Sequence, residues 1–193
     1  MAKVCIVTGA SRGMGYGIAK ILAEEEGATV YATARSKQAL DDLSASTKDS
    51  LGVIHPCVLD QADDGAVERF VLNVKAKEKQ IDLLVNSAYG GLTAMAPHFG
   101  KPFWEKPISV FDGSIDVGVR SSYVMSALVA PSMIREKNGL IVQISSYGGF
   151  TYLFDVGYGV AHAAMDRLSF DMATELHEHN VRAVTFHPGG GQT

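Results

Sequence analysis

Six short runs rich in β-branched and other apolar residues alternate along this chain with longer stretches of helical spacing. This alternation is typical of βαβ units around a parallel sheet, whose strands are nearly continuously apolar because helices cover both faces. The sequence therefore predicts an α/β fold with a six-stranded parallel sheet. The predicted strands are Val4 to Thr8, Ala28 to Ala34, Val53 to Leu59, Ile81 to Asn86, Leu140 to Ser145, and Val181 to Phe186.

Two predicted helices have clear signals. The first begins after Gly13 and ends at Gly27, a residue that readily adopts the left-handed conformation that closes a helix. The last begins near Tyr158 and carries a single apolar stripe. Because the chain contains no internal repeat, low-complexity tract or Pro-rich linker, residues 1–193 are expected to form one domain.

The connection from Tyr89 to about Phe111 is predicted to be a long loop, and loops of more than about 15 residues are often functional. It is rich in large apolar side chains, which could form a lid over an apolar pocket or simply anchor the loop. These side chains are Leu92, Met95, Phe99, Phe103 and Trp104.

The distribution of charge and the length of the apolar runs argue against two classes of function. Seventeen Lys and Arg residues against 21 Asp and Glu residues give a net charge of -4 without a basic stripe, so a nucleic-acid partner is not expected. The apolar runs are far shorter than the ~20 residues that span a bilayer, so no transmembrane span is expected.

The two cysteines, Cys5 and Cys57, each lie in a strand-like run, which makes a disulfide framework implausible. The N-terminus passes directly into the first strand and leaves no room for a signal peptide. These features favour the cytoplasm or another reducing compartment, and they leave association with an organelle membrane open.

The segment Thr8-Gly-Ala-Ser-Arg-Gly-Met-Gly15 is the strongest functional motif because it follows the first strand and opens a helix. A helix N-terminus presents unpaired amides, and glycines let a diphosphate approach that backbone closely. An ordinary glycine-rich turn is the alternative, but the strand and helix on either side favour an anion site. The predicted contacts are Gly9, Ser11, Arg12, Gly13, Met14 and Gly15.

This turn resembles that of the short-chain dehydrogenase/reductase family, and further family motifs are matched in the same order along essentially the whole chain. The matching positions are Arg35, Asp60, Asn86 to Tyr89, Ser146, Tyr158 to His162, and Pro188-Gly189. The strings Asn86 to Tyr89, Phe103 to Pro107, Ile144 to Ser146 and Tyr158 to Val160 are most similar to the dehydrogenase/reductase member 1 subgroup. The resemblance implies a doubly wound parallel (Rossmann) sheet in three αβα layers, with the family's seventh strand missing beyond Thr193.

The resemblance also implies a nicotinamide dinucleotide at the carboxyl edge of the sheet, with further contacts from Asn86, Ala88, Pro188 and Gly189. The second strand ends at Arg35 without an acidic residue to repel a 2′-phosphate, and Arg12 adds another cation, so NADP(H) is favoured over NAD(H). Asp60 matches the family's adenine-contacting Asp but also suits a helix cap, and both roles can coexist.

For the chemistry, the resemblance implies that Tyr158 donates a proton while Ser146 hydrogen-bonds the substrate carbonyl. At the position of the family's Lys stands His162, whose imidazole is fully charged only below its pKa of ~6.5 and so depresses the phenol pKa less. Asp166 could raise the pKa of His162 if it faces that ring. Asp116 stands where the family usually has its active-site Asn.

Two functions remain open. The first is NADP-dependent reduction of a small apolar ketone or aldehyde, with steroids implied by the subgroup resemblance. The second is a catalytically weak or inactive nucleotide-binding pseudoenzyme, suggested by His162, Asp116 and the short C-terminus. Self-association into a homo-oligomer is expected because the helices after Asp116 and Tyr158 resemble those by which family members pair, although packing against the sheet also takes part of each face.

Overall fold

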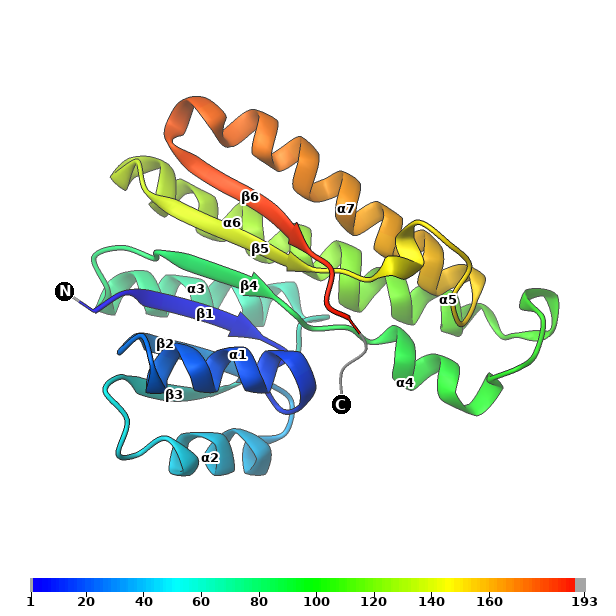
Figure 1. Cartoon of the computed structure of the whole chain (residues 1–193), viewed down its shortest axis with the longest axis horizontal. Coiled ribbons are helices and arrows are strands. Elements are labelled where there is room, and N and C mark those ends of the chain that lie inside the picture. The colour runs from blue at the N-terminus through cyan, green and yellow to red at the C-terminus, as the bar shows by residue number, and fades with distance from the viewer. Residues whose placement is uncertain (1, 190–193) are drawn as a thin grey trace.

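The computed structural model describes residues 2–189, which form one six-stranded parallel sheet in the order β3-β2-β1-β4-β5-β6 (Figure 1). The order reverses between β1 and β4, which places a crevice at the carboxyl ends of these strands. The doubly wound α/β prediction is confirmed, and all six predicted strands are present with small shifts at their ends. The strands are β1 Val4–Thr8, β2 Thr29–Ala34, β3 Val53–Val58, β4 Leu83–Asn86, β5 Gly139–Ile144 and β6 Val181–Phe186.

Helices cover both faces of the sheet and separate two apolar cores. Side chains alternate across each strand, so Ile6 faces one core while Cys5 and Val7 face the other. Helices α1 Gly13–Glu24 and α2 Lys37–Ser46 enclose one core. Helices α3 Asp64–Lys77, α6 Ser121–Glu136 and α7 Val156–Leu176 enclose the other.

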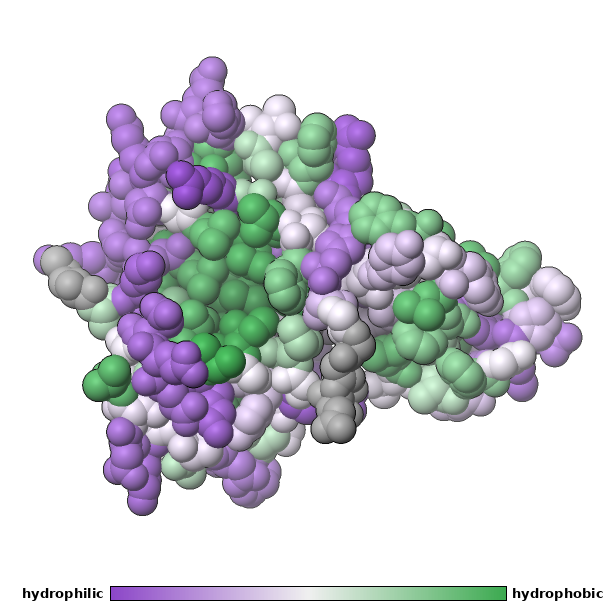
Figure 2. All heavy atoms as spheres, viewed as in Figure 1, coloured by the Kyte–Doolittle hydropathy of each residue, from purple (hydrophilic) through white to green (hydrophobic). Residues whose placement is uncertain are grey.

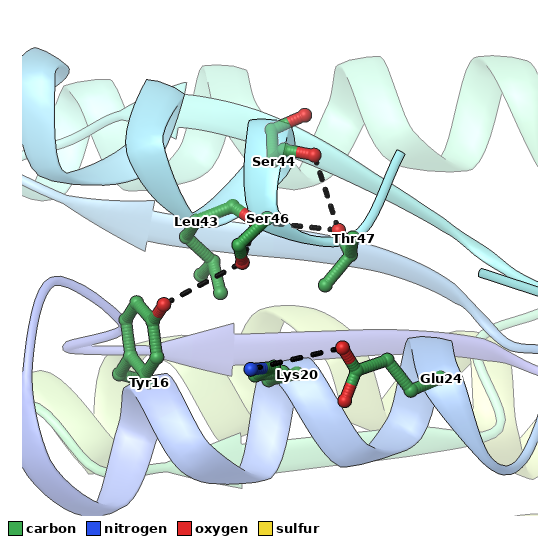
Figure 3. Close-up of polar contacts among 7 residues, drawn as sticks. All are labelled: Tyr16, Lys20, Glu24, Leu43, Ser44, Ser46 and Thr47. Carbon is green, nitrogen blue, oxygen red and sulfur yellow. Dashed lines mark hydrogen bonds and ion pairs between the residues drawn. The ribbon is translucent and has the colours of Figure 1, made fainter. Parts of the chain in front are cut away.

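Helices α1 and α2 lie side by side and are linked through polar side chains (Figure 3). The Tyr16 hydroxyl on α1 lies 3.5 Å from the Ser46 hydroxyl at the end of α2. Ser46 donates to the Leu43 carbonyl, and Thr47 donates to the carbonyls of Leu43 and Ser44. These bonds satisfy carbonyls in the last turn of α2, which have no helical partner of their own.

Helices α1 and α2 cover only part of their face of the sheet, and apolar side chains on the rest of that face are exposed (Figure 2). Val142 and Ile144 on β5 pack against the core that α1 and α2 enclose, but they are only partly buried. Their parallel partners on β6, Val184 and Phe186, are 44% and 50% exposed. Within residues 2–189, the helices that contact β5 and β6 are α6 and α7 on the opposite face.

The connection after β4 is not the irregular loop that the sequence predicted. It contains α4 Gly91–Met95, 3-10 turns at Ala96–His98 and Phe103–Glu105, and α5 Ile108–Ser114. A kinked segment, Ile115–Arg120, then joins α5 to α6. Short helical turns satisfy their own backbone hydrogen-bonding groups. They are too short to produce a long apolar period in the sequence, so the sequence did not predict them.

The large apolar residues of this connection do not act together as a lid. Met95 is buried and anchors the segment, and Leu92 lines the cavity described below. Phe99, Phe103 and Trp104 are 62 to 72% exposed and do not line that cavity.

Further along the chain, the 3-10 turn Tyr147–Gly149 precedes α7 and the 3-10 turn His177–His179 follows it. No helix between residues 2 and 189 is long and apolar enough to cross a membrane.

Candidate active site

The glycine turn after β1 holds its backbone against the neighbouring strand. Gly9 has a positive φ of 68°, and a Cβ on it would lie 2.8 Å from the Cα of Ala88. A Cβ on Gly15 would lie 2.5 Å from the Gly9 carbonyl oxygen. Both positions therefore require glycine, for conformation and space at Gly9 and for space at Gly15.

The N-terminus of α1 is open to an anion. Its N-cap residue, Arg12, has an extended backbone, and its side chain caps none of the helix amides within the described residues. The first turn of α1 contains no acidic residue. The amides of this turn and the positive end of the helix dipole are thus available to a negatively charged group.

A buried hydroxyl fixes the turn relative to β4. The Thr8 side chain is 2% exposed, and its oxygen accepts hydrogen bonds from the amides of Ser87 at 3.0 Å and Ala88 at 3.1 Å. The carboxyl ends of β1 and β4 are therefore tied together at the switch in strand order. From the sequence, Thr8 is only the first residue of the glycine motif. Its role is not visible there because its partners, Ser87 and Ala88, are distant along the chain and come close only when the sheet forms.

A cavity of about 730 Å³ runs from the glycine turn to the start of α7. Most of the predicted site residues line it. They are Gly9, Ser11, Arg12, Gly13, Met14, Gly15, Arg35, Asp60, Ala88, Tyr158, His162 and Pro188. The lining also includes Gln61, Tyr89 and Thr93, which the site prediction did not include. From the sequence, Tyr89 is recognised only as the last residue of the Asn86 to Tyr89 motif.

Four predicted residues do not line the cavity: Asn86, Ser146, Gly189 and Asp116. Asn86 is buried, and its amide donates to the Ser126 hydroxyl at 3.0 Å, which ties β4 to α6. Gly189 is exposed. Ser146 follows Ser145, which does line the cavity.

Asp60 is exposed at the cavity, and its Oδ1 accepts from the Ala62 amide at 3.0 Å. The predicted alternative, that it caps the following helix, is wrong. The N-cap of α3 is Asp63, which accepts from the Ala66 amide. Asp60 instead closes a local turn that holds its carboxylate beside the cavity.

Ser146 and Tyr158 occupy the ends of two elements that meet near the cavity. Ser146 follows β5 and accepts a hydrogen bond from the Gly148 amide at 3.2 Å. A hydroxyl that accepts through its oxygen still has its own proton to donate. Tyr158 lies in the first turn of α7 and is 8% exposed.

The His162 ring packs against Tyr158 at a tilt and is fixed by the backbone of its own helix. The two ring centroids lie 4.0 Å apart, and His162 Nδ1 lies 2.8 Å from the Tyr158 carbonyl oxygen. Because a carbonyl only accepts, this contact assigns the proton to Nδ1. Burial lowers the pKa of His162, so the imidazole is neutral at pH 7.

Asp166 does not reverse that outcome. Its charge favours protonated His162, but burial has the larger effect and the pKa of His162 is lowered overall. The Asp166 carboxylate is paired with another ring, His187 Nε2, at 3.0 Å. His187 in turn stacks on Phe150, with ring centroids 5.0 Å apart.

Tyr89 completes an aromatic cluster with Tyr158 and His162. Its ring centroid lies 5.7 Å from that of Tyr158 and 4.9 Å from that of His162. The Tyr89 hydroxyl donates to Ser114 at 3.1 Å, and burial raises the pKa of its phenol. Tyr89 is therefore a neutral wall of the site at neutral pH.

Asp116 is not brought to this cluster. It is exposed, and its neighbour Val117 lines the cavity instead. The backbone leaves helical geometry at Val117 and Gly118, where the Val117 carbonyl accepts from the Gly90 amide at 2.6 Å. This kink separates the side chain of Asp116 from Ser146, Tyr158 and His162, which the sequence pattern alone does not reveal.

Comparison with known proteins defines the class of this site. The sequence model described as short chain dehydrogenase matches residues 3–193, and the chain belongs to that family. Within the family, it is 43% identical over 195 residues to dehydrogenase/reductase SDR family member 1 of Mus musculus, covering 99% of this chain and 61% of that protein. The predicted family and subgroup resemblance is confirmed, and the chain spans about three fifths of its relative's length.

Solved structures of related proteins share the fold. A metagenomic short-chain oxidoreductase in complex with NADP superposes with a TM-score of 0.88 at 31% identity, covering 97% of this chain and 82% of that one. A 7α-hydroxysteroid dehydrogenase complexed with NADH and 7-oxo glycochenodeoxycholic acid gives a TM-score of 0.86 at 29% identity, covering 97% of this chain and 70% of that one.

Proposed function

We propose that this protein binds NADP(H) and reduces an apolar ketone or aldehyde, with Tyr158 as the proton donor. The observation that carries this proposal is that one continuous cavity joins the glycine turn to Tyr158 and His162. The amides at the open N-terminus of α1 would hold the diphosphate of a dinucleotide bound in that cavity.

The residues present fit the cofactor. A Cβ at Gly9 would collide with the backbone of Ala88, and one at Gly15 would collide with the backbone of Gly9, so glycine keeps the turn tight where it lines the cavity. Arg12 and Arg35 line the same cavity and supply cations. Two guanidinium groups suit the 2′-phosphate of NADP, and bidentate contact to phosphate is the geometry that Arg favours. The related metagenomic oxidoreductase in complex with NADP supports the same choice.

When bound, the reduced nicotinamide supplies the hydride. The chain's own groups then manage the oxygen of the substrate carbonyl, where negative charge develops. Tyr158, which lines the cavity, supplies the proton that completes the alcohol. Ser146 directly follows the cavity-lining Ser145, and in this proposal its hydroxyl turns its proton toward the same oxygen when substrate binds. Apolar groups of the 90–97 segment and Val117 exclude water at this end of the cavity.

A second candidate function is nucleotide binding without efficient turnover. His162 favours it, because a neutral imidazole held by its own helix cannot lower the phenol pKa as an ammonium would. The placement of Asp116 outside the cavity favours it as well. Both candidates require the same nucleotide site, so binding alone does not distinguish them.

Turnover distinguishes them. NADPH consumption is measured with a panel of apolar ketones, aldehydes and oxo-steroids for the parent chain, His162→Lys and Tyr158→Phe. The reductase proposal predicts a rate that rises about tenfold with Lys and falls by 10²-fold or more with Phe. No rate in any variant, with NADPH binding intact, favours the second candidate.

We also infer that self-association uses helices α6 and α7. Their outer faces carry Tyr123 and Phe170, which are 58% and 66% exposed. Analytical ultracentrifugation of the parent and of a Tyr123→Glu, Phe170→Glu double variant tests this inference. The double variant should sediment with a lower mass than the parent, and an equal mass would contradict the inference.

A further inference from the structure

One ion pair of this molecule is almost completely buried. Lys106 Nζ lies 2.9 Å from Asp155 Oδ2, and the two side chains are 6% and 5% exposed. Burying two charges is costly, and such a pair often adds little net stability over apolar residues of similar volume. Its presence therefore suggests a role other than stability.

The Asp155 carboxylate also holds the residue that carries the reactive phenol. Its second oxygen, Oδ1, accepts from the Tyr158 amide at 2.7 Å, so Asp155 is the N-cap of α7. A neutral Asn would cap this helix about as well. The negative charge and its buried lysine partner are thus more than the cap requires.

Lys106 belongs to the connection between β4 and α6, just before α5, and the earlier residues Leu92, Thr93 and Pro97 of this connection line the cavity. Asp155 is the N-cap of α7, from which Tyr158 and His162 line the same cavity. Neither Lys106 nor Asp155 lines the cavity itself. The ion pair therefore joins two segments that each contribute other residues to the cavity lining.

The charge on Asp155 reaches this site. Burial is the main cause of the raised pKa of Tyr89, and the charge of Asp155 is the smallest of its causes. The Tyr89 ring contacts Tyr158 edge to face, and Lys106 neutralises the Asp155 carboxylate at 2.9 Å. Either partner alone would leave an uncompensated charge in a site of low dielectric constant.

We propose that Lys106 and Asp155 are positioning residues that anchor the start of α7 to the connection after β4, and so hold the phenol of Tyr158 at a fixed place beside a neutralised charge pair. This inference rests on the proposed reductase function for its catalytic meaning. Its physical content, that the pair controls the position and ionisation of Tyr158, does not depend on turnover.

The test uses Lys106→Met, Asp155→Asn and the double variant, with Lys101→Met as a control for an exposed lysine of the same connection. The phenol of Tyr158 is titrated by NMR in protein labelled with ¹³C at the tyrosine ring, and Tyr158→Phe identifies its signal. The titratable neighbours are Tyr89 on the connection and His162 on α7.

The expected shifts have opposite signs. Lys106→Met leaves an unpaired carboxylate at the N-cap of the helix that carries Tyr158 and should raise the pKa of the phenol, whereas Asp155→Asn leaves an unpaired ammonium and should lower it. The double variant returns close to the parent value, and Lys101→Met does not move it. A purely structural role would lower the melting temperature without opposite shifts. Shifts of the same sign, or none, would overturn the proposal.

Position is tested by hydrogen exchange. The Tyr158 amide is expected to exchange about tenfold faster in Lys106→Met than in Lys101→Met, because the cap loses its anchor to the connection after β4. Equal exchange in the two variants would overturn the positioning role. If the parent consumes no NADPH with any carbonyl, the proposed function fails, while the NMR and exchange results still decide this inference.

Discussion

The two ends of the cavity are built from different materials. At the phosphate end, the surface comes from backbone amides whose arrangement is set by Gly9, Gly15 and the Thr8 hydroxyl. At the chemical end, the surface comes from the rings of Tyr89, Tyr158 and His162. Backbone geometry persists as long as the glycines do, whereas side-chain chemistry changes with one substitution. His162, which stands at the position of the family's Lys, lies at the second end.

The largest expected effect is at the chemical end. Ser146→Ala removes a hydroxyl whose proton is free to donate, so kcat should fall by about 10²-fold. The Kd for NADPH should stay within about twofold, because the phosphate end is untouched. Stopped-flow turnover and fluorescence titration measure the two quantities. A parallel loss of binding and rate would show that the two ends are not separable.

The next effect is at the phosphate end. Gly9→Ala places a side chain at a positive φ and against Ala88, which costs on the order of 1–3 kcal/mol. The turn must shift to relieve this strain, so NADPH affinity should fall by about 30-fold.

The matched control is Gly17→Ala on α1, the helix that follows the turn, where an added Cβ meets nothing within 4 Å. It should leave NADPH affinity unchanged and increase stability by about 0.5–1 kcal/mol. Equal affinity in the two variants would contradict the role of the turn.

A smaller effect concerns cofactor choice. Arg35→Asp replaces an exposed cation at the cavity with an anion, so the Kd for NADPH should rise about tenfold while that for NADH changes little. Isothermal titration with both cofactors measures the ratio. An unchanged ratio would assign the preference elsewhere, with Arg12 the first residue to examine.

The smallest effect is a pH dependence of stability. Burial lowers the pKa of His162, so below the unfolded pKa of about 6.5 the unfolded chain binds more protons than the folded one. This residue's contribution to the free energy of unfolding should therefore fall as the pH is lowered from 7 to 5. The stability difference between the parent and His162→Gln, measured by urea denaturation, should shrink over that range. A difference that grows on acidification would mean that His162 is protonated in the fold.

The fold was largely predictable because each strand is a compact apolar run and the glycine turn follows the first one directly. The errors arose where tertiary contacts decide. Short helical turns such as α4 and α5 carry no long periodic pattern, and the kink at Val117 and Gly118 turns Asp116 away from the cavity.

At the site, residue types were predictable and their states were not. Spacing placed Tyr158 and His162 on one helix face, but the Nδ1 contact that fixes the tautomer depends on backbone and ring orientation. Asp155 had a recognisable signal as an Asp three residues before Tyr158, typical of a helix cap. Lys106 had none, because its partner is 49 residues away.

The two edges of the sheet differ in one respect that concerns handling of the protein. Edge strand β3 contains Pro56, which removes a backbone donor, whereas edge strand β6 reads Val-Arg-Ala-Val-Thr-Phe and can pair along its whole length. Within residues 2–189 no further strand pairs with the outer side of β6, and Val184 and Phe186 are exposed, so in the chain as given this strand is an edge on which intermolecular pairing can begin. A charged residue at 184 should therefore delay aggregation of this chain on concentration or heating.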